Sequence, residues 1–145
     1  MKLDNTNARS TPKARGFTLL ELLVVMVIIG MLAAFVAPRY FAQVGKSQAK
    51  AAKAQIMALE QALDQFRLDV GRYPSNEEGL QALNAAPASV SGWAGPYLKK
   101  AAPSDPWGHP FIYVQPGTHG EMDLSSYGKD GREGGTGENA DITNW

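Results

Sequence analysis

Apolar residues form two long blocks that are organised in different ways. Residues 17–37, FTLLELLVVMVIIGMLAAFVA, are almost continuously apolar, and among them only Thr18 and Glu21 are polar. As a helix this segment rises roughly 30 Å, which is the thickness of the hydrocarbon core of a bilayer. It is also longer than the apolar part of a cleaved secretory signal, which is about 7 to 15 residues. The sequence therefore predicts a membrane-spanning helix over residues 17–37.

The second block is periodic, and it follows Pro38. Proline lacks an amide donor, so we expect a kink or a local unwinding at that residue. Beyond it, apolar residues recur every three or four positions, which is typical of an amphipathic helix, and Gly71 predicts its end. The stripe is too short for a coiled coil and lacks flanking charge pairs, so we expect it to lie on the chain's own sheet. Its members are Ala52, Ile56, Leu59, Leu63, Phe66 and Val70.

The remaining pattern predicts a small α+β head with short elements. Ser75 and Glu78 form a capping box, which predicts a short helix that ends near Asn84 with its leucines inward. Residues 85–106 are rich in Ala, Pro, Ser and Gly and predict a loop. Residues 111–114 and 122–127 predict two short strands joined by a turn. The expected fold is a long N-terminal helix, half transmembrane and half amphipathic, packed on a small antiparallel β-sheet.

Composition and charge exclude several classes of function. The 145 residues include no cysteine, which excludes disulfides, a thiolate zinc site and a cysteine nucleophile. Lys and Arg number 14, as do Asp and Glu, and this balance argues against nucleic-acid binding. The two histidines fall in predicted turns and no catalytic set is evident, so we expect no enzymatic activity.

The charges are unevenly distributed along the chain. Residues 1–16 carry a net charge of +3, the remainder carries −3, and the acidic excess is concentrated after residue 113. Basic residues ahead of the apolar segment favour a cytoplasmic N-terminus, although Arg39, Lys46, Lys50 and Lys53 on the far side weaken that argument.

The N-terminal sequence resembles that of type IV pilin-like proteins. A short basic leader ends in Gly16, Phe17 follows it, and Glu21 stands ahead of an unbroken apolar run. The resemblance implies cleavage by a prepilin peptidase between Gly16 and Phe17, N-methylation of Phe17, and pairing of Glu21 with the Phe17 amine of a neighbouring subunit during assembly. A carboxylate at depth in a bilayer costs about 2.5–3.5 kcal/mol, which favours such a partner, whereas a position near the headgroups needs none.

The C-terminal segment, GKDGREGGTGENADITNW, is dense in glycine and acidic residues. Such a composition suits a disordered tail, but Ile142 and Trp145 favour burial and therefore a loop that folds back. An ordered loop with carboxylates and free carbonyls suits calcium, which binds six to eight oxygens. Asp130 and Asp141 have the separation of the first and last EF-hand ligands, but the intervening ligands are missing. The loop is therefore not an EF-hand.

Further motifs resemble the major pseudopilins of type II secretion systems, the general secretion pathway protein G family. The resemblance implies a calcium ion in the C-terminal loop, bound by the carboxylates of Asp130 and Asp141 and the carbonyls of Tyr127 and Arg132. Some members have two adjacent aspartates where this chain has Ala140 and Asp141, so Asn139, Glu138 or a carbonyl would replace one ligand. The motifs are Arg72-Tyr73-Pro74, Glu78-Gly79-Leu80-Gln81-Ala82-Leu83, Asp105-Pro106-Trp107-Gly108, Pro116-Gly117-Thr118-His119-Gly120 and residues 137–145.

This second resemblance implies three regions and a structural role. Residues 1–16 would be a cleaved leader, residues 17–37 a transmembrane and assembly helix, and residues 38–145 a periplasmic head on the inner membrane. The chain would form a helical homopolymer, a periplasmic fibre that drives folded proteins across the outer membrane. Its expected partners are minor pseudopilins, the prepilin peptidase, and an inner-membrane platform with its ATPase. The alternatives are a type IV pilin for adhesion, motility or DNA uptake, and a membrane-anchored periplasmic calcium-binding protein or enzyme.

Overall fold

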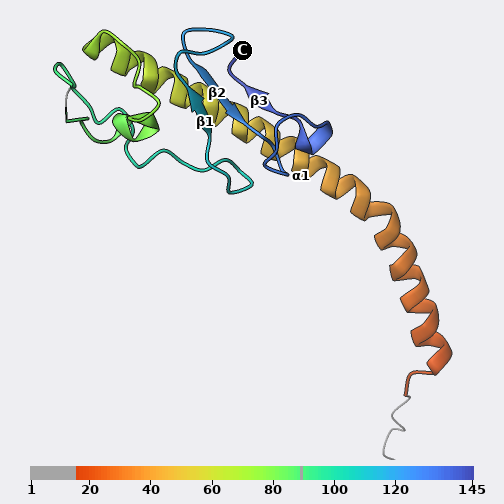
Figure 1. The fold of residues 1–145 in the computed structure, drawn as a ribbon. Coiled ribbons are helices and arrows are strands. Elements are labelled where there is room, and N and C mark those ends of the chain that lie inside the picture. The colour runs from red at the N-terminus through yellow and green to blue at the C-terminus, as the bar shows by residue number, and fades with distance from the viewer. Residues whose placement is uncertain (1–15, 89) are drawn as a thin grey trace, which may run out of the picture. The chain divides into compact units, whose positions relative to one another are not determined.

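A computed structural model describes residues 16–88 and 90–145, and Figure 1 traces the chain. The chain divides into two compact units, Met1–Tyr40 and Phe41–Trp145. Apart from Gly16, the expected leader lies outside the described residues.

The longest element is the helix α1, Leu19–Val70. It is long and apolar enough to cross a membrane, and its large apolar side chains up to Val36 are exposed. Pro38 lies inside the helix, so of the two expected effects, a kink or a local unwinding, the unwinding does not occur. Proline removes a single amide donor, and the long helix on both sides of Pro38 is sufficient to carry the helical geometry across it. Gly71 ends α1 with a φ of 87°, as predicted.

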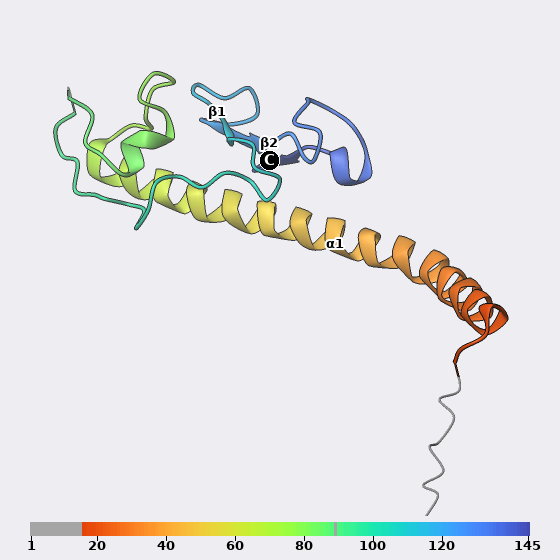
Figure 2. The ribbon, with the colours of Figure 1, turned by 90° about the horizontal axis from the view of Figure 1, so that it is seen from below.

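The second half of α1 supplies the core of the larger unit. The first five members of the predicted stripe, Ala52 to Phe66, are buried, and Val70 packs at the edge of the cluster. Figure 2 shows the strands lying along this part of the helix. The apolar stripe therefore packs on the chain's own sheet, as the periodicity predicts. Its main buried partners are Leu83, Phe111, Met122 and Leu124.

The short helix after Ser75 is a 3₁₀ helix, η1, Gly79–Leu83. The predicted capping box precedes it: the Glu78 amide donates to Ser75 Oγ at 3.3 Å, and the Ser75 amide donates to Glu78 Oε2 at 2.8 Å. Arg72 forms an ion pair with the Glu78 carboxylate at 2.6 Å. This pair and the Ser75 amide lower the pKa of Glu78 to about 2.

Three antiparallel strands form a sheet in the order β1-β2-β3. The strands β1, Ile112–Val114, and β2, Asp123–Ser126, lie within the two predicted segments. The third strand, β3, Ile142–Thr143, pairs with β2 so that Ser126 faces Ile142. The sequence analysis missed it because two residues carry no periodic pattern. A 3₁₀ turn, η2, Gly137–Asn139, precedes β3.

Candidate functional site

The start of α1 carries a capping box that the sequence analysis did not recognise. The Glu21 amide donates to Thr18 Oγ1 at 3.1 Å, while Glu21 Oε2 accepts from the Thr18 amide at 2.9 Å and from its hydroxyl at 3.0 Å. The pattern Thr-x-x-Glu ahead of an apolar run is the usual signature of such a box. Glu21 therefore has a partner within its own chain. Its pairing with a neighbouring subunit stays a prediction.

The C-terminal loop is ordered and closes on itself rather than trailing as a tail. The Lys129 amide donates to the Glu138 carbonyl at 3.0 Å, which joins the outgoing and returning limbs. Gly128 stands at this junction with a φ of 66°, and a Cβ there would lie 2.8 Å from the Ala140 carbonyl oxygen. Only glycine fits this conformation and this close approach without strain. The two limbs therefore meet at residues 128–129 and 138–140.

The expected ligand residues lie along these two limbs, where their carboxylates accept bonds from the loop backbone. Asp130 Oδ1 accepts from the Arg132 amide at 3.2 Å, and Asp141 Oδ2 accepts from the Gly134 amide at 2.9 Å. The second oxygen, Asp141 Oδ1, is buried and accepts no hydrogen bond within the described residues.

Close backbone contacts bring some of the expected ligands near one another. Tyr127 follows β2 directly, and Asn139 ends η2 on the facing limb. Gly128 lies between them, because a Cβ on this residue would come within 3.0 Å of the backbone of residues 138–140. In the described part of the chain, no three acidic or histidine side chains gather into a metal cluster. An ion here would depend on carbonyl oxygens as well as carboxylates.

A set of contacts that we call the C-terminal clasp holds the segment beyond Asp141: Asn144 bonds to β2, and Trp145 stacks on His119. The side-chain oxygen Asn144 Oδ1 accepts from the backbone amide of Leu124 at 2.9 Å. The backbone amide of Asn144 donates to the Leu124 carbonyl at 3.0 Å. The Trp145 indole stacks on the His119 imidazole, with ring centroids 4.0 Å apart and planes at 6°. The clasp fixes β3 and, with it, the position of Asp141.

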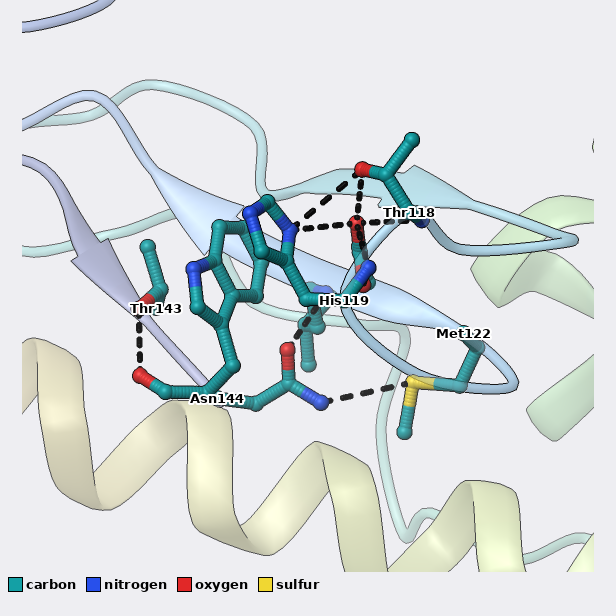
Figure 3. Close-up of polar contacts among 8 residues, drawn as sticks. Thr118, His119, Met122, Thr143 and Asn144 are labelled. Atoms are coloured by element: carbon teal, nitrogen blue, oxygen red, sulfur yellow. Dashed lines mark hydrogen bonds and ion pairs between the residues drawn. The ribbon is translucent and has the colours of Figure 1, made fainter.

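His119 lies in the turn between β1 and β2, as predicted, and its side chain also takes part in a local network. Its Nδ1 lies 3.0 Å from Asp123 Oδ2, which also accepts from the Thr118 hydroxyl at 2.8 Å (Figure 3). Burial tends to raise the pKa of Asp123, but the hydrogen bonds from His119 and Thr118 outweigh burial and lower it to about 2. An ionised Asp123 therefore organises the turn on which Trp145 rests.

The loop also rests on α1. Glu138 covers Gly45, where a Cβ would lie 2.7 Å from Glu138 Cγ, and Lys129 pairs with the Glu138 carboxylate at 2.5 Å. Nearer the chain end, Lys53 Nζ donates to the Thr143 carbonyl at 2.5 Å. The absence of a side chain at Gly45 is what allows the loop to approach the helix this closely.

These features together define a class of protein. A helix long enough to span a membrane begins beside a Gly-Phe junction, and its second half carries a small antiparallel sheet with a structured C-terminal loop. That combination is the architecture of a membrane-anchored, type IV pilin-like subunit.

The comparisons with known proteins narrow the class, and the chain belongs to the family of type II secretion system protein G. The model of that family matches residues 39–145, and the prokaryotic N-terminal methylation motif matches residues 11–37. The type II secretion system core protein G of Pseudomonas aeruginosa is 46% identical over 134 residues, which cover 90% of this chain and 94% of the relative. The Escherichia coli K12 protein of the same name is 47% identical, covering 94% of each chain.

A solved structure agrees with this assignment. The major pseudopilin from the type 2 secretion system of enterohaemorrhagic Escherichia coli aligns with a TM-score of 0.61 at 31% sequence identity. The alignment covers 72% of this chain and 92% of that one. The expected family and the expected fold class are therefore both confirmed.

Proposed function

We propose that this chain is the major structural subunit of a type II secretion pseudopilus, a fibre that drives export of folded proteins across the outer membrane. The observation that carries the proposal is the family match over residues 39–145 together with the methylation motif over residues 11–37. The role is structural rather than enzymatic. Both histidines serve local structure, since His109 contacts Gly128 and His119 pairs with Asp123.

The N-terminal helix would perform both anchoring and polymerisation. A prepilin peptidase would cleave between Gly16 and Phe17 and methylate the new Phe17 amine. The subunit would wait in the inner membrane on residues 17–37, with the head of residues 38–145 in the periplasm. Its helices would then pack into the core of the fibre, where the Glu21 carboxylate of one subunit meets the Phe17 amine of the next. Opposite charges attract far more strongly in that apolar core than in water.

The assembly role of Glu21 can be separated from its capping role by one substitution. Glu21→Gln keeps a side-chain oxygen for the Thr18 amide, since glutamine also serves in capping boxes, but it removes the charge. If Glu21 pairs with a methylated amine, Glu21→Gln and Glu21→Ala both lose fibre assembly. Full fibre assembly by Glu21→Gln would assign the residue to capping alone.

The residues of the C-terminal loop fit a calcium ion. Asp141 Oδ1 is buried and unpaired within the described residues, and an unpaired buried carboxylate oxygen is costly unless it meets a cation. The residues that would hold calcium are Asp130, Asp141 and Asn139 with the carbonyls of Tyr127 and Arg132, an oxygen set that suits this ion. Bound calcium would supply positive charge that offsets most of the −3 of residues 17–145 and ties the two limbs together.

The calcium proposal is tested by thermal unfolding of the full chain in a mild detergent at increasing calcium concentration. A ligand that binds only the folded state raises the melting temperature. Asp130→Ala should remove that rise, whereas Glu133→Ala, which removes an exposed acid of the same loop, should keep it. An equal rise in the wild type and in Asp130→Ala would refute this site.

The partners proposed for the fibre are further copies of the chain, minor pseudopilins, and an inner-membrane platform with its ATPase. The deciding experiment is deletion of the gene, scored for secreted proteins and for surface pili. Loss of secretion that a plasmid-borne copy restores supports the proposal. Loss of pili with normal secretion would favour the alternative, a type IV pilin. Intact mass gives an independent check, because a chain that still begins at Met1 contradicts processing at Gly16.

A further inference from the structure

Asp105 is the most deeply buried carboxylate in the head, and neither polymerisation nor calcium coordination uses it directly. Its side chain is fully buried, and it belongs to the Asp105-Pro106-Trp107-Gly108 segment. Asp105 Oδ1 accepts from the amides of Trp107 and His109 at 3.0 and 2.8 Å, and Oδ2 accepts from the Ser126 hydroxyl at 2.6 Å. The carboxylate is thus fully engaged, and one of its partners lies at the end of β2.

Ser126 carries this contact to the base of the C-terminal loop. Because its proton is committed to Asp105, Ser126 Oγ presents its lone pairs to other donors, and the Gly128 amide donates to it at 3.3 Å. The Gly128 carbonyl lies 3.2 Å from His109 Nδ1, which must carry the proton of that bond because a carbonyl can only accept. Gly128 is therefore fixed through both of its backbone polar groups.

Fixing the Gly128 amide also fixes the carbonyl that precedes it. The Tyr127–Gly128 peptide bond is trans, and in a planar trans peptide the N–H and C=O groups point in opposite directions. The amide points to Ser126 Oγ, so the Tyr127 carbonyl points away from the buried Asp105–Ser126 pair. The Gly128–Lys129 peptide plane is also fixed at both of its polar groups. Its carbonyl accepts from His109 Nδ1, and its amide donates to the Glu138 carbonyl.

We infer that Asp105 and Ser126 are positioning residues that orient the Tyr127 carbonyl as a calcium ligand. The inference rests on the proposed calcium site, and it assigns a role to a buried aspartate far from the loop in sequence. Hydrogen-bond partners that hold metal ligands in place typically contribute about 10- to 100-fold to metal affinity. A carbonyl ligand depends on such support, since its direction is set only by its peptide plane.

The test measures calcium affinity by isothermal titration of the full chain in detergent micelles. Ser126→Ala removes the acceptor of the Gly128 amide and should weaken calcium binding about 10- to 100-fold. Asp105→Asn, which disturbs the same relay one step further back, should weaken binding in the same direction. Ser125→Ala is the matched control, because Ser125 is a buried serine on the same strand whose hydroxyl lies outside this network.

A second readout separates orientation of the ligand from general stability. Amide exchange measured by NMR in the presence of calcium should show faster exchange at Gly128 in Ser126→Ala than in Ser125→Ala. If the wild type binds calcium and Ser126→Ala binds it equally well, the positioning role is wrong and the calcium site stands. If the wild type binds no calcium, the calcium site and the positioning role both fail.

Discussion

The C-terminal clasp predicts that stability depends on one hydrogen bond, from the backbone amide of Leu124 to the side chain of Asn144. Asn144 Oδ1 accepts from the amide of Leu124, which is fully buried in the middle of β2. Asn144 Nδ2 donates to Glu60 Oε1 on α1 at 3.3 Å and lies 3.7 Å from Met122 Sδ. Asn144→Ala would leave the buried Leu124 amide without an acceptor.

The expected loss in the free energy of unfolding follows from the unpaired Leu124 amide. A buried donor that loses its partner costs about 1–3 kcal/mol, whereas the longer, part-buried bond to Glu60 adds less because both of its groups can still reach water. We therefore expect Asn144→Ala to lower the free energy of unfolding by about 2 kcal/mol. Thr143→Ala is the neighbouring control, because among the described residues the Thr143 hydroxyl bonds only to the exposed Trp145 carbonyl. It should cost less than about 0.5 kcal/mol.

The assay is urea unfolding of the full chain in a mild detergent, followed by near-ultraviolet circular dichroism. Asn144→Asp supplies a second comparison, since it keeps an acceptor for Leu124 but faces Glu60 with a like charge. Replacing Glu60 by Gln in that background should recover part of the loss. Equal stability of Asn144→Ala and Thr143→Ala would refute the argument that the Leu124 amide depends on Asn144.

Three further outcomes follow from the described geometry. The ionised forms of Glu78 and Asp123 stabilise the fold, because their pKa values of about 2 lie below the ordinary 4.5 and 3.8. Stability should therefore be complete above about pH 5 and fall as the pH approaches 2, and Glu78→Gln should flatten that fall in an acid titration. Gly128→Ala should destabilise the head more than Gly134→Ala in thermal unfolding, because both residues have positive φ but only Gly128 has backbone atoms in the way of a Cβ. Leu63→Ala should cost about 2–5 kcal/mol in urea unfolding, since Leu63 is fully buried in the core, and a cost below 1 kcal/mol would contradict that packing.

Local patterns were sufficient to predict the parts of the fold that local forces determine. The stripe from Ala52 to Phe66 repeats over several turns, so the face of α1 that packs on the sheet follows from periodicity alone. The Ser75–Glu78 box spans four residues and was predicted with both of its bonds. The Thr18–Glu21 box is equally local, but the sequence analysis did not recognise it because it treated Glu21 through its depth in the membrane and its role in assembly.

Contacts between distant segments could not be predicted in the same way. The strand β3 exists because Asn144 bonds to Leu124 and Thr143 pairs with Ser125, and nothing in the two residues of the strand indicates this. The relay from Asp105 to Gly128 likewise joins residues more than twenty positions apart. A sequence shows that a carboxylate or a glycine is present, but the pairing depends on the packing of the whole head.

The same long-range contacts determine what calcium would do to the molecule. The C-terminal loop is held at one limb by Asp105 through Ser126, and at the other by α1, through Glu138 on Gly45 and Lys53 on Thr143. A loop with free ends would gain order on binding an ion and leave the rest of the head unchanged. Because this loop unfolds only when its contacts to β2 and α1 break, binding energy at the loop also stabilises the core beneath it. Calcium should therefore raise the unfolding temperature of the whole head in a single transition.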